Sequence, residues 1–317
     1  MTKNNLLSLG LPTYKRPDAA IRLINLALDI NIYDEIVISS NSMESELDQF
    51  FDNLSSNIPI TYNVQKENVG LSSNYLSLIQ LSNCEYIHIV SDEDYLIKKN
   101  ISKAKEYLHN SNASLVALSV LDENNIIYKD SLNADKKIPN FCSDYGHIGC
   151  SIIKRSIWKE DHYEQMRKYS LRRGSVYPTS AAAIISYSAD RSIECIEDPL
   201  IKMGKKHQNS EIRGKNIYGF ESRASQLLSI IDLLKPLKLK NKNIIIFKAI
   251  YFFSSHAFLD SYIKFNENFV SLYLSKRLLN SEFSVTSKVF LGISILFSYI
   301  IRAWRFLKAI IKKIIFK

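Results

Sequence analysis

Three consecutive carboxylates, Asp92, Glu93 and Asp94, follow the short apolar run of residues 86–90. In an extended segment, side chains two residues apart point the same way, so Asp92 and Asp94 can face one ligand together. Two hard oxygen donors on one side suit Mg²⁺ or Mn²⁺, and such a cation also binds phosphate oxygens and neutralises a departing diphosphate. The alternative is a solvated acidic turn that caps a helix expected to start near Ile97. These three residues alone leave both interpretations open.

Strands and helices alternate through the first 120 residues, which predicts how the acidic segment is positioned. The helical segments show apolar residues three and four apart, and the strand segments are short apolar runs closed by polar residues. The expected strands cover residues 6–12, 35–39, 60–64, 86–90 and 114–120, and the expected helices cover residues 20–28, 46–54, 72–81 and 101–110. This alternation predicts an α/β fold with a mostly parallel sheet and helices on both faces.

Polar residues stand at the end of each of the first four expected strands. These segments read "LPTYKRP", "SSNS", "KENVG" and "SDED" along the chain. Open α/β sheets bind ligands outside the carboxyl ends of their strands. The four segments are therefore expected to converge on one site at one edge of the sheet.

Composition limits the classes of protein that fit. The 317 residues are 46% hydrophobic and 23% charged, as in a globular protein, and the four cysteines show no CxxC spacing typical of zinc sites. The formal net charge is +9, but residues 302–317 carry six basic side chains and no acid, and without these six the charge falls to +3. The body of the protein is therefore not a polycation, which argues against nucleic acid as a partner.

The regular alternation of strands and helices changes from about residue 140. The chain as a whole is therefore expected to form three regions. Residues 1–210 form the expected nucleotide-binding and catalytic domain, residues 211–283 a helical region, and residues 284–317 a basic amphipathic helix. The apolar run of residues 289–301 is too short to span a bilayer, so the tail is expected to lie on an anionic membrane surface. Packing on the body or self-association are the alternatives. No signal peptide is evident at the start, so we expect a cytoplasmic protein, peripheral on the inner face of the plasma membrane.

Three motifs occur in order: "LGLPTYKRP", "NVGLSSNYL" and "EYIHIVSDEDYL". Together they resemble the family 2 glycosyltransferases of GT-A fold, particularly the abequosyltransferase-like bacterial enzymes of O-antigen and capsule assembly. The resemblance covers about residues 5–205. It implies a nucleotide-sugar donor, a glycan acceptor that is often lipid-linked, and a Mn²⁺ or Mg²⁺ cofactor.

The resemblance also implies site residues. Asp92 and Asp94 would hold the metal and the diphosphate, with His207 as a further metal ligand. The implied nucleotide-sugar-binding residues are Pro12, Thr13, Tyr14, Arg16, Asn41, Asn68, Gly70, Asn74 and Asp92. Tyr14 offers an aromatic face to a base, and Gly70 permits close backbone approach and an unusual φ at a helix start.

Two departures from the family pattern concern the base pocket and the general base. Asn41 stands in "SSNS", where the family usually has an Asp, so the identity of the nucleobase is open. An inverting transfer needs a carboxylate near the acceptor hydroxyl. The family usually supplies it from a Glu-Asp pair, and the corresponding segment here, "VYPTSAA", has no acid. Asp144 and Asp198 are the two substitutes.

These observations predict a metal-dependent, inverting glycosyltransferase. One alternative is a relative that binds sugar or nucleotide at the membrane but has lost its catalytic base. Another is a nucleotidyltransferase, although the first strand carries only Gly10 and no glycine-rich phosphate loop.

Overall fold

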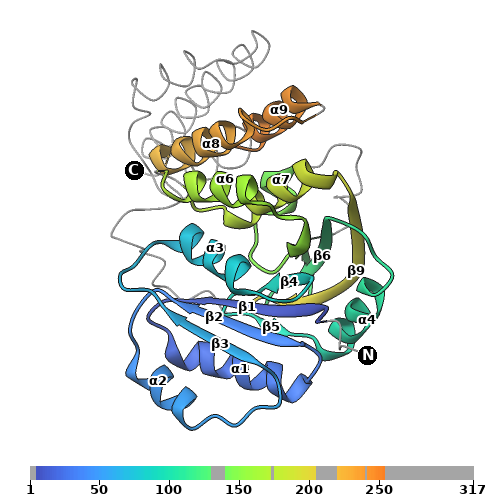
Figure 1. Ribbon diagram of the computed structural model, residues 1–317. Coiled ribbons are helices and arrows are strands. Elements are labelled where there is room, and N and C mark those ends of the chain that lie inside the picture. Colours follow the sequence, from blue (N-terminus) through green and yellow to red (C-terminus); the bar gives the residue numbers. More distant parts are fainter. Residues whose placement is uncertain (1–4, 130–139, 173–174, 205–219, 240, 254–317) are drawn as a thin grey trace, which may run out of the picture.

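The computed structural model describes residues 5–129, 140–172, 175–204, 220–239 and 241–253 (Figure 1). The expected alternation of strands and helices is present in its first half. The elements in chain order are β1 (Leu7–Thr13), α1 (Pro17–Ile30), β2 (Glu35–Ser40), α2 (Ser45–Asp52), β3 (Ile60–Val64), α3 (Leu71–Leu81), β4 (Tyr86–Ile89), β5 (Tyr95–Leu96), α4 (Lys98–Leu108), β6 (Leu115–Leu121), β7 (Ile127–Lys129), α5 (Phe141–Asp144), β8 (Ser151–Lys154), a 3₁₀ turn η2 (Arg155–Ile157), α6 (Glu160–Ser170), α7 (Pro178–Asp190), β9 (Ile193–Lys202), α8 (Phe220–Leu234) and α9 (Lys242–Phe252).

The strands form one sheet in the order β3-β2-β1-β4-β8-β6-β9-β5, with β7 paired to β6. Strands β1 to β4 run parallel to one another, as expected. Strand β8 is antiparallel to both of its neighbours, β4 and β6, so the second half of the sheet is mixed. The expected α/β class is confirmed, and the antiparallel insertion is an addition that the first 120 residues could not reveal.

Helices cover both faces of the parallel part of the sheet (Figure 1). On one face, α1 buries completely the apolar positions spaced at three and four residues, namely Ala20, Leu23, Ile24 and Ala27. On the other face, α3 packs against β1 and β2. Burying these stripes stabilises the sheet that carries the candidate site, at about 25 cal/mol per Å² of apolar surface.

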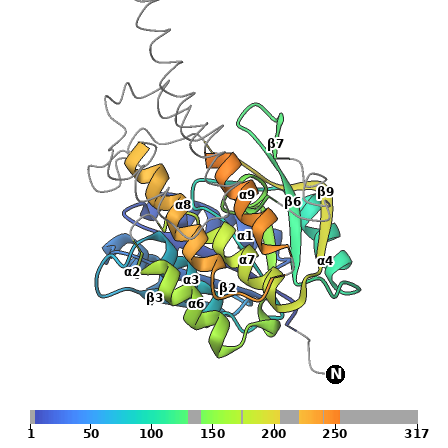
Figure 2. The same ribbon diagram turned by 90° about the horizontal axis from the view of Figure 1, so that it is seen from above.

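Further helices lie beyond α3 (Figures 1 and 2). Helix α7 begins with Pro178 at its first position and packs with α6 and β8. Helices α8 and α9 pack on α5, α6 and α7. Among the described residues, no helix has both the length and the hydropathy required to cross a membrane. The expected amphipathic helix of residues 284–317 lies outside the described residues.

Strand register explains why polar residues of different segments meet. Thr13 pairs with Ser40, and Ser40 pairs with Val64, so β1, β2 and β3 end level with one another. Gly10 of β1 pairs with Ile89 of β4, which brings Thr13 level with Asp92, three residues further along each chain segment.

A buried histidine ties the centre of β4 to the loop before β8. His88 is fully buried, with Nδ1 at 3.1 Å from the Tyr33 hydroxyl and Nε2 at 3.1 Å from the Gly149 carbonyl oxygen. Burial raises the pKa of Tyr33 above its usual range, so the hydroxyl stays protonated and donates to Nδ1. Nε2 therefore carries the proton and donates to Gly149. Burial also lowers the pKa of His88 from 6.5 to about 4, which keeps the ring neutral.

Replacing His88 with glutamine should reduce the acid sensitivity of folding. The unfolded chain binds a proton at its ordinary pKa of 6.5, whereas the folded protein binds it only near 4. The contribution of His88 to stability is therefore present above pH 6.5 and is lost as the pH falls toward 4. Between these limits the natural protein should lose on the order of 3 kcal/mol more than His88→Gln. Urea unfolding at a series of pH values measures the difference, and identical pH profiles would contradict it.

Candidate active site

The acidic segment after β4 is buried. Asp92 is 0% exposed and Asp94 is 3% exposed, although both are charged residue types. Ser91 and Asp94 close a turn through a hydrogen bond of 3.0 Å from Asp94 N–H to the Ser91 carbonyl. The segment is therefore a turn, not the expected extended run, and the two carboxylates meet different partners. Helix α4 has no acidic residue in its first turn and no side-chain cap, so the helix-cap interpretation is wrong.

Asp92 is held by two residues from the end of β1. Thr13 Oγ1 donates to Oδ2 of Asp92 at 2.8 Å. Arg16 Nη2 lies 2.8 Å from Oδ1, at an angle that makes an ion pair without a hydrogen bond. The other end of the Arg16 guanidinium contacts the Glu93 carboxylate. Thr13 and Arg16, two expected site residues, thus meet the acidic segment directly.

Replacing Asp92 with asparagine should stabilise the fold at alkaline pH. Burial raises the pKa of Asp92 from 3.8 to about 6, although Arg16 and Thr13 act to lower it. The stability that this raised pKa contributes is present below pH 3.8 and is lost as the pH rises through 6. At about pH 8 the charged side chain opposes folding, and Asp92→Asn should gain on the order of 1–3 kcal/mol. Urea unfolding tests this, and a less stable variant at that pH would refute it.

Arg22 of α1 supports the backbone of the acidic segment. Its Nη2 donates to the carbonyl oxygens of Asp92 at 2.8 Å and Asp94 at 3.0 Å, and its guanidinium lies 4.0 Å from the ring centre of Tyr95. Two carbonyls bound by one guanidinium fix the turn between them. No pattern in the sequence predicts this role, because an arginine beside the apolar stripe of a helix is ordinarily a solvated residue.

Asp94 accepts from two other parts of the chain. Gly204, just after β9, donates its backbone N–H to Oδ1 at 3.2 Å. His147, in the loop before β8, places Nε2 at 3.3 Å from Oδ2. A Cβ on Gly204 would lie 1.8 Å from the Glu93 carbonyl oxygen, so only glycine fits there. The candidate site thus joins the ends of β4 and β9 with the loop before β8.

A second group of expected residues gathers beside β1, where β2 ends and α3 begins. Asn41 donates from Nδ2 to the Gly70 carbonyl at 3.3 Å, and Asn74 donates to the Ser39 carbonyl at 2.9 Å. Gly70 has a φ of 84°, as expected for its position before α3, and its N–H donates to Asn68 Oδ1 at 2.9 Å. The Oδ1 atoms of Asn41 and Asn74 are buried and accept no hydrogen bond from any residue that the structure describes. Both are available to a donor group of a ligand.

Pro12 and Tyr14 flank Thr13 at the end of β1. Pro12 is buried and pairs with Ser39 of β2. Tyr14 is half-buried, and the Lys15 amine lies 5.4 Å from its ring centre. Lys15 itself has a φ of 55°, which turns the chain sharply away from the strand. Their contact with a nucleotide stays a prediction.

The two candidate general bases lie in different places. Asp144 ends α5 and accepts from the Asn140 N–H at 2.8 Å, three residues before His147. Asp198 is on β9, where its half-exposed carboxylate pairs with Lys103 of α4 at 2.8 Å. The structure therefore brings Asp144 into the loop that reaches Asp94, while the contact of Asp198 is on the outer surface. His207 lies outside the described residues.

The acidic segment has the donor chemistry for a divalent cation. Asp94 is buried, and its two oxygens together accept one N–H and contact one imidazole, which leaves lone pairs for a metal ion. Asp92 is already paired with Arg16, so Asp94 is the stronger ligand. Within the described ranges, no three His, Cys, Asp or Glu side chains are grouped as a complete metal site. Phosphate oxygens and water would complete the coordination, as is usual for Mg²⁺.

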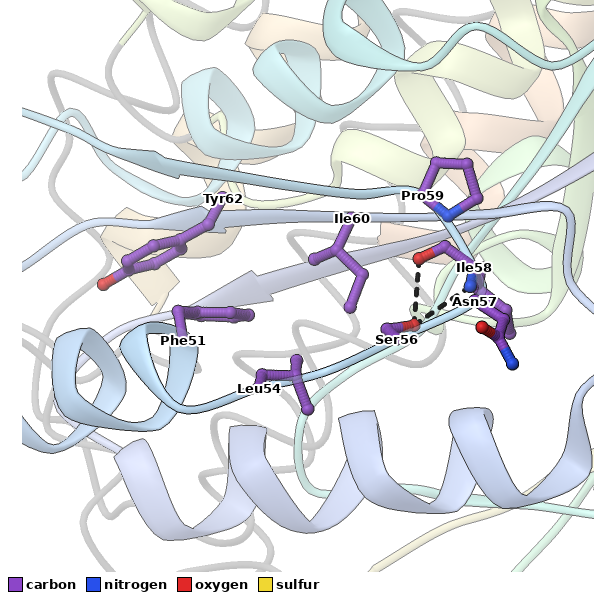
Figure 3. A pocket seen from close by; sticks show the side chains of 8 residues that line it. All are labelled: Phe51, Leu54, Ser56, Asn57, Ile58, Pro59, Ile60 and Tyr62. Carbon is purple, nitrogen blue, oxygen red and sulfur yellow. Dashed lines mark hydrogen bonds between the residues drawn. The ribbon is translucent and has the colours of Figure 1, made fainter.

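A hollow of about 520 Å³ lies elsewhere, at the β3 edge of the sheet (Figure 3). Phe51 of α2 stacks on Tyr62 of β3 beside it, with ring centres 4.3 Å apart. Among the described residues that line this hollow there is no carboxylate, imidazole or basic side chain. It therefore lacks the groups that the acidic segment offers for chemistry on a phosphate ester.

Comparisons with known proteins identify a family and a fold for this chain. The model of the family described as "Glycosyl transferase family 2" matches residues 8–193. The structure resembles S. aureus TarS 1–349 in complex with UDP-GlcNAc, with a TM-score of 0.64 and 12% identity over 87% of this chain and 79% of that chain. It also resembles the mannosyltransferase PcManGT from Pyrobaculum calidifontis in complex with GDP-Man and Mn²⁺, with a TM-score of 0.52 and 10% identity over 97% and 85% of the two chains. At such identities these likenesses show the fold. No curated protein matches the sequence.

Proposed function

The chain belongs to glycosyl transferase family 2, and from this we propose that it moves a sugar from a nucleotide-activated donor to a lipid-linked glycan. Membership supports a glycosyltransferase that uses a nucleotide sugar and argues against the nucleotidyltransferase alternative. The proposed parts are the acceptor, the inversion of configuration, the divalent cation and the role of each residue. The narrower assignment, an abequosyltransferase-like enzyme of O-antigen or capsule synthesis, is supported by the three sequence motifs.

One observation carries the proposal: two buried carboxylates at the end of β4 contact the end of β1, the end of β9 and the loop before β8. Burying two carboxylates close together costs free energy. Such arrangements are typical of functional sites, where the charges bind a ligand. Asp94, with Asp92 behind it, would hold the Mn²⁺ or Mg²⁺. When bound, that cation would neutralise the negative charge that develops on the departing nucleoside diphosphate.

The remaining residues position the donor. Asn41 and Asn74 present buried side-chain carbonyl oxygens, and Gly70, with its positive φ, turns the chain into α3 beside them, so this group is suited to the nucleoside. Arg16 balances the charge of Asp92 and Glu93. Arg22 keeps the acidic turn in place through two backbone carbonyls. Each group is held by hydrogen bonds, so little reorganisation is needed when the donor binds.

Asp144 is the stronger of the two candidates for the general base. It would accept the proton of the acceptor hydroxyl as that oxygen attacks the anomeric carbon and the bond to the diphosphate breaks. The support is its place in the loop that reaches Asp94. Asp198 is engaged with Lys103 on the outer surface.

The acceptor and the location are proposed from the tail. Residues 302–317 carry six basic side chains and alternate them with apolar ones. Each basic residue near an anionic leaflet contributes about 1 kcal/mol. A cytoplasmic enzyme held on the inner face of the plasma membrane in this way would meet acceptors carried on lipid.

A catalytically inactive sugar-binding relative is the second candidate. It is favoured by the observation that the carboxylates of Asp144 and Asp198 both have protein partners. A panel of nucleotide sugars, incubated with the full chain and a lipid extract, separates the two. An active enzyme releases nucleoside diphosphate from at least one donor, and the release depends on Mn²⁺ or Mg²⁺. Tight donor binding without release from any member of the panel would support the inactive relative.

A further inference from the structure

We propose that His147 is a nitrogen ligand of the divalent cation and makes the site favour Mn²⁺ over Mg²⁺. This inference rests on the proposed function, because it assumes that the cation binds at Asp94. His147 lies outside the three sequence motifs on which the resemblance to the family rests.

The distance between the side chains of His147 and Asp94 is close to that expected for two ligands of one cation. His147 Nε2 lies 3.3 Å from Asp94 Oδ2. Two donors that bind one octahedral ion at about 2.1 Å and at right angles are about 3.0 Å apart. A small movement therefore turns the observed contact into a pair of adjacent ligands. The other oxygen of Asp94, Oδ1, accepts from Gly204 N–H and is oriented by it.

The loop that carries His147 is fixed on both sides. Before it, Ser180 of α7 donates to the Tyr145 carbonyl at 3.1 Å. After it, His88 donates to the Gly149 carbonyl at 3.1 Å, and Cys150 N–H closes a turn onto the His147 carbonyl at 3.3 Å. The His147 side chain is 19% exposed. A histidine held this firmly beside a buried carboxylate has the preorganisation that a metal ligand needs.

The chemistry of imidazole sets the expected selectivity. Mg²⁺ prefers carboxylate, carbonyl and water oxygens, whereas imidazole nitrogen suits first-row transition ions. A site made only from Asp92 and Asp94 would offer oxygen alone. Adding His147 shifts the preference toward Mn²⁺, and replacing His147 by a carboxylate should shift it back toward Mg²⁺.

The test measures the cation directly in the full chain. Mn²⁺ is titrated in the presence of UDP or GDP and followed by electron paramagnetic resonance, and pulsed measurements detect the ¹⁴N coupling of a bound imidazole. In a His207→Gln background, which removes the other histidine implied as a metal ligand, His147→Gln should lose this coupling and bind Mn²⁺ at least about tenfold more weakly. His147→Asp should recover binding and raise the affinity for Mg²⁺ relative to Mn²⁺. His109→Gln, which changes an exposed histidine at the end of α4, is the matched control and should behave as the natural protein does.

The outcomes separate this inference from the proposed function. A ¹⁴N coupling of unchanged strength after His147→Gln in the His207→Gln background would show that His147 is not the ligand and would overturn the inference. Mn²⁺ bound without ¹⁴N coupling in the natural protein would overturn it equally. Both results would leave the glycosyltransferase function intact. Absence of binding for every nucleoside diphosphate, measured by calorimetry, would instead count against the proposed function and would remove the basis of the inference too.

Discussion

Asp94→Asn should abolish sugar transfer while leaving the fold intact. Asparagine has the same size and still offers Oδ1 to the Gly204 N–H, so the turn keeps its hydrogen bond. The substitution removes the anionic ligand, and with it most of the stabilisation of the departing diphosphate. A cation at a leaving group supplies several kcal/mol, so kcat/KM should fall at least about 10³-fold.

The measurement is release of nucleoside diphosphate by the natural protein and the variant at saturating Mn²⁺. Asp161→Asn is a matched control, because Asp161 is a largely exposed aspartate on α6 whose carboxylate lies beside His162. It should keep full activity. Activity of Asp94→Asn within about threefold of the natural protein would show that this carboxylate does not serve the leaving group.

Gly204→Ala should damage the site through the backbone. The added Cβ would lie 1.8 Å from the carbonyl oxygen and 2.7 Å from the carbonyl carbon of Glu93, and neither atom belongs to a flexible side chain. The acidic turn or the end of β9 must therefore move. The pairing of Tyr95 with Lys202, which joins β5 to β9 next to this contact, would be strained as well.

Displacement of a reacting group by about 1 Å can cost about 10²-fold in rate, so kcat/KM should fall by at least that factor. Overpacking of this kind also costs about 1–3 kcal/mol of stability. Steady-state kinetics together with urea unfolding separate the two effects, because mispositioning persists under conditions where the variant is fully folded. A folded Gly204→Ala variant with unchanged kinetics would show that the close contact between Gly204 and the Glu93 backbone is not needed for catalysis.

The first half of the fold was predictable because local patterns decide it. Apolar residues at helical spacing in α1 are buried as expected, and the polar segments after β1, β2 and β4 meet because parallel strands end at one edge. The structure brings Thr13 and Arg16 into contact with Asp92 at this edge, where their two segments were expected to converge. These residues lie at or just after the ends of β1 and β4, two strands that pair in parallel, so their contacts depend only on sequence position and strand register.

The contacts of Asp94 could not be predicted, because they join residues far apart in the chain. His147 and Gly204 lie 53 and 110 positions away from Asp94. His147 reaches it only because β8 enters the sheet antiparallel to β4, a topology that no local pattern in "GHIGCSIIK" indicates. The expected extended conformation of "SDED" was wrong for a related reason. Arg22 and Gly204 stabilise a turn there, and both are distant residues.

The most direct test of the account locates the cation and the diphosphate together. Crystals of the full chain grown with Mn²⁺ and a nucleoside diphosphate should give an anomalous manganese peak within about 2.5 Å of an Asp94 carboxylate oxygen, with diphosphate oxygens on the same ion. Asp94 is buried at the end of β4, so such a peak would place the leaving group there. A diphosphate bound with its manganese away from Asp92 and Asp94 would contradict the central claim.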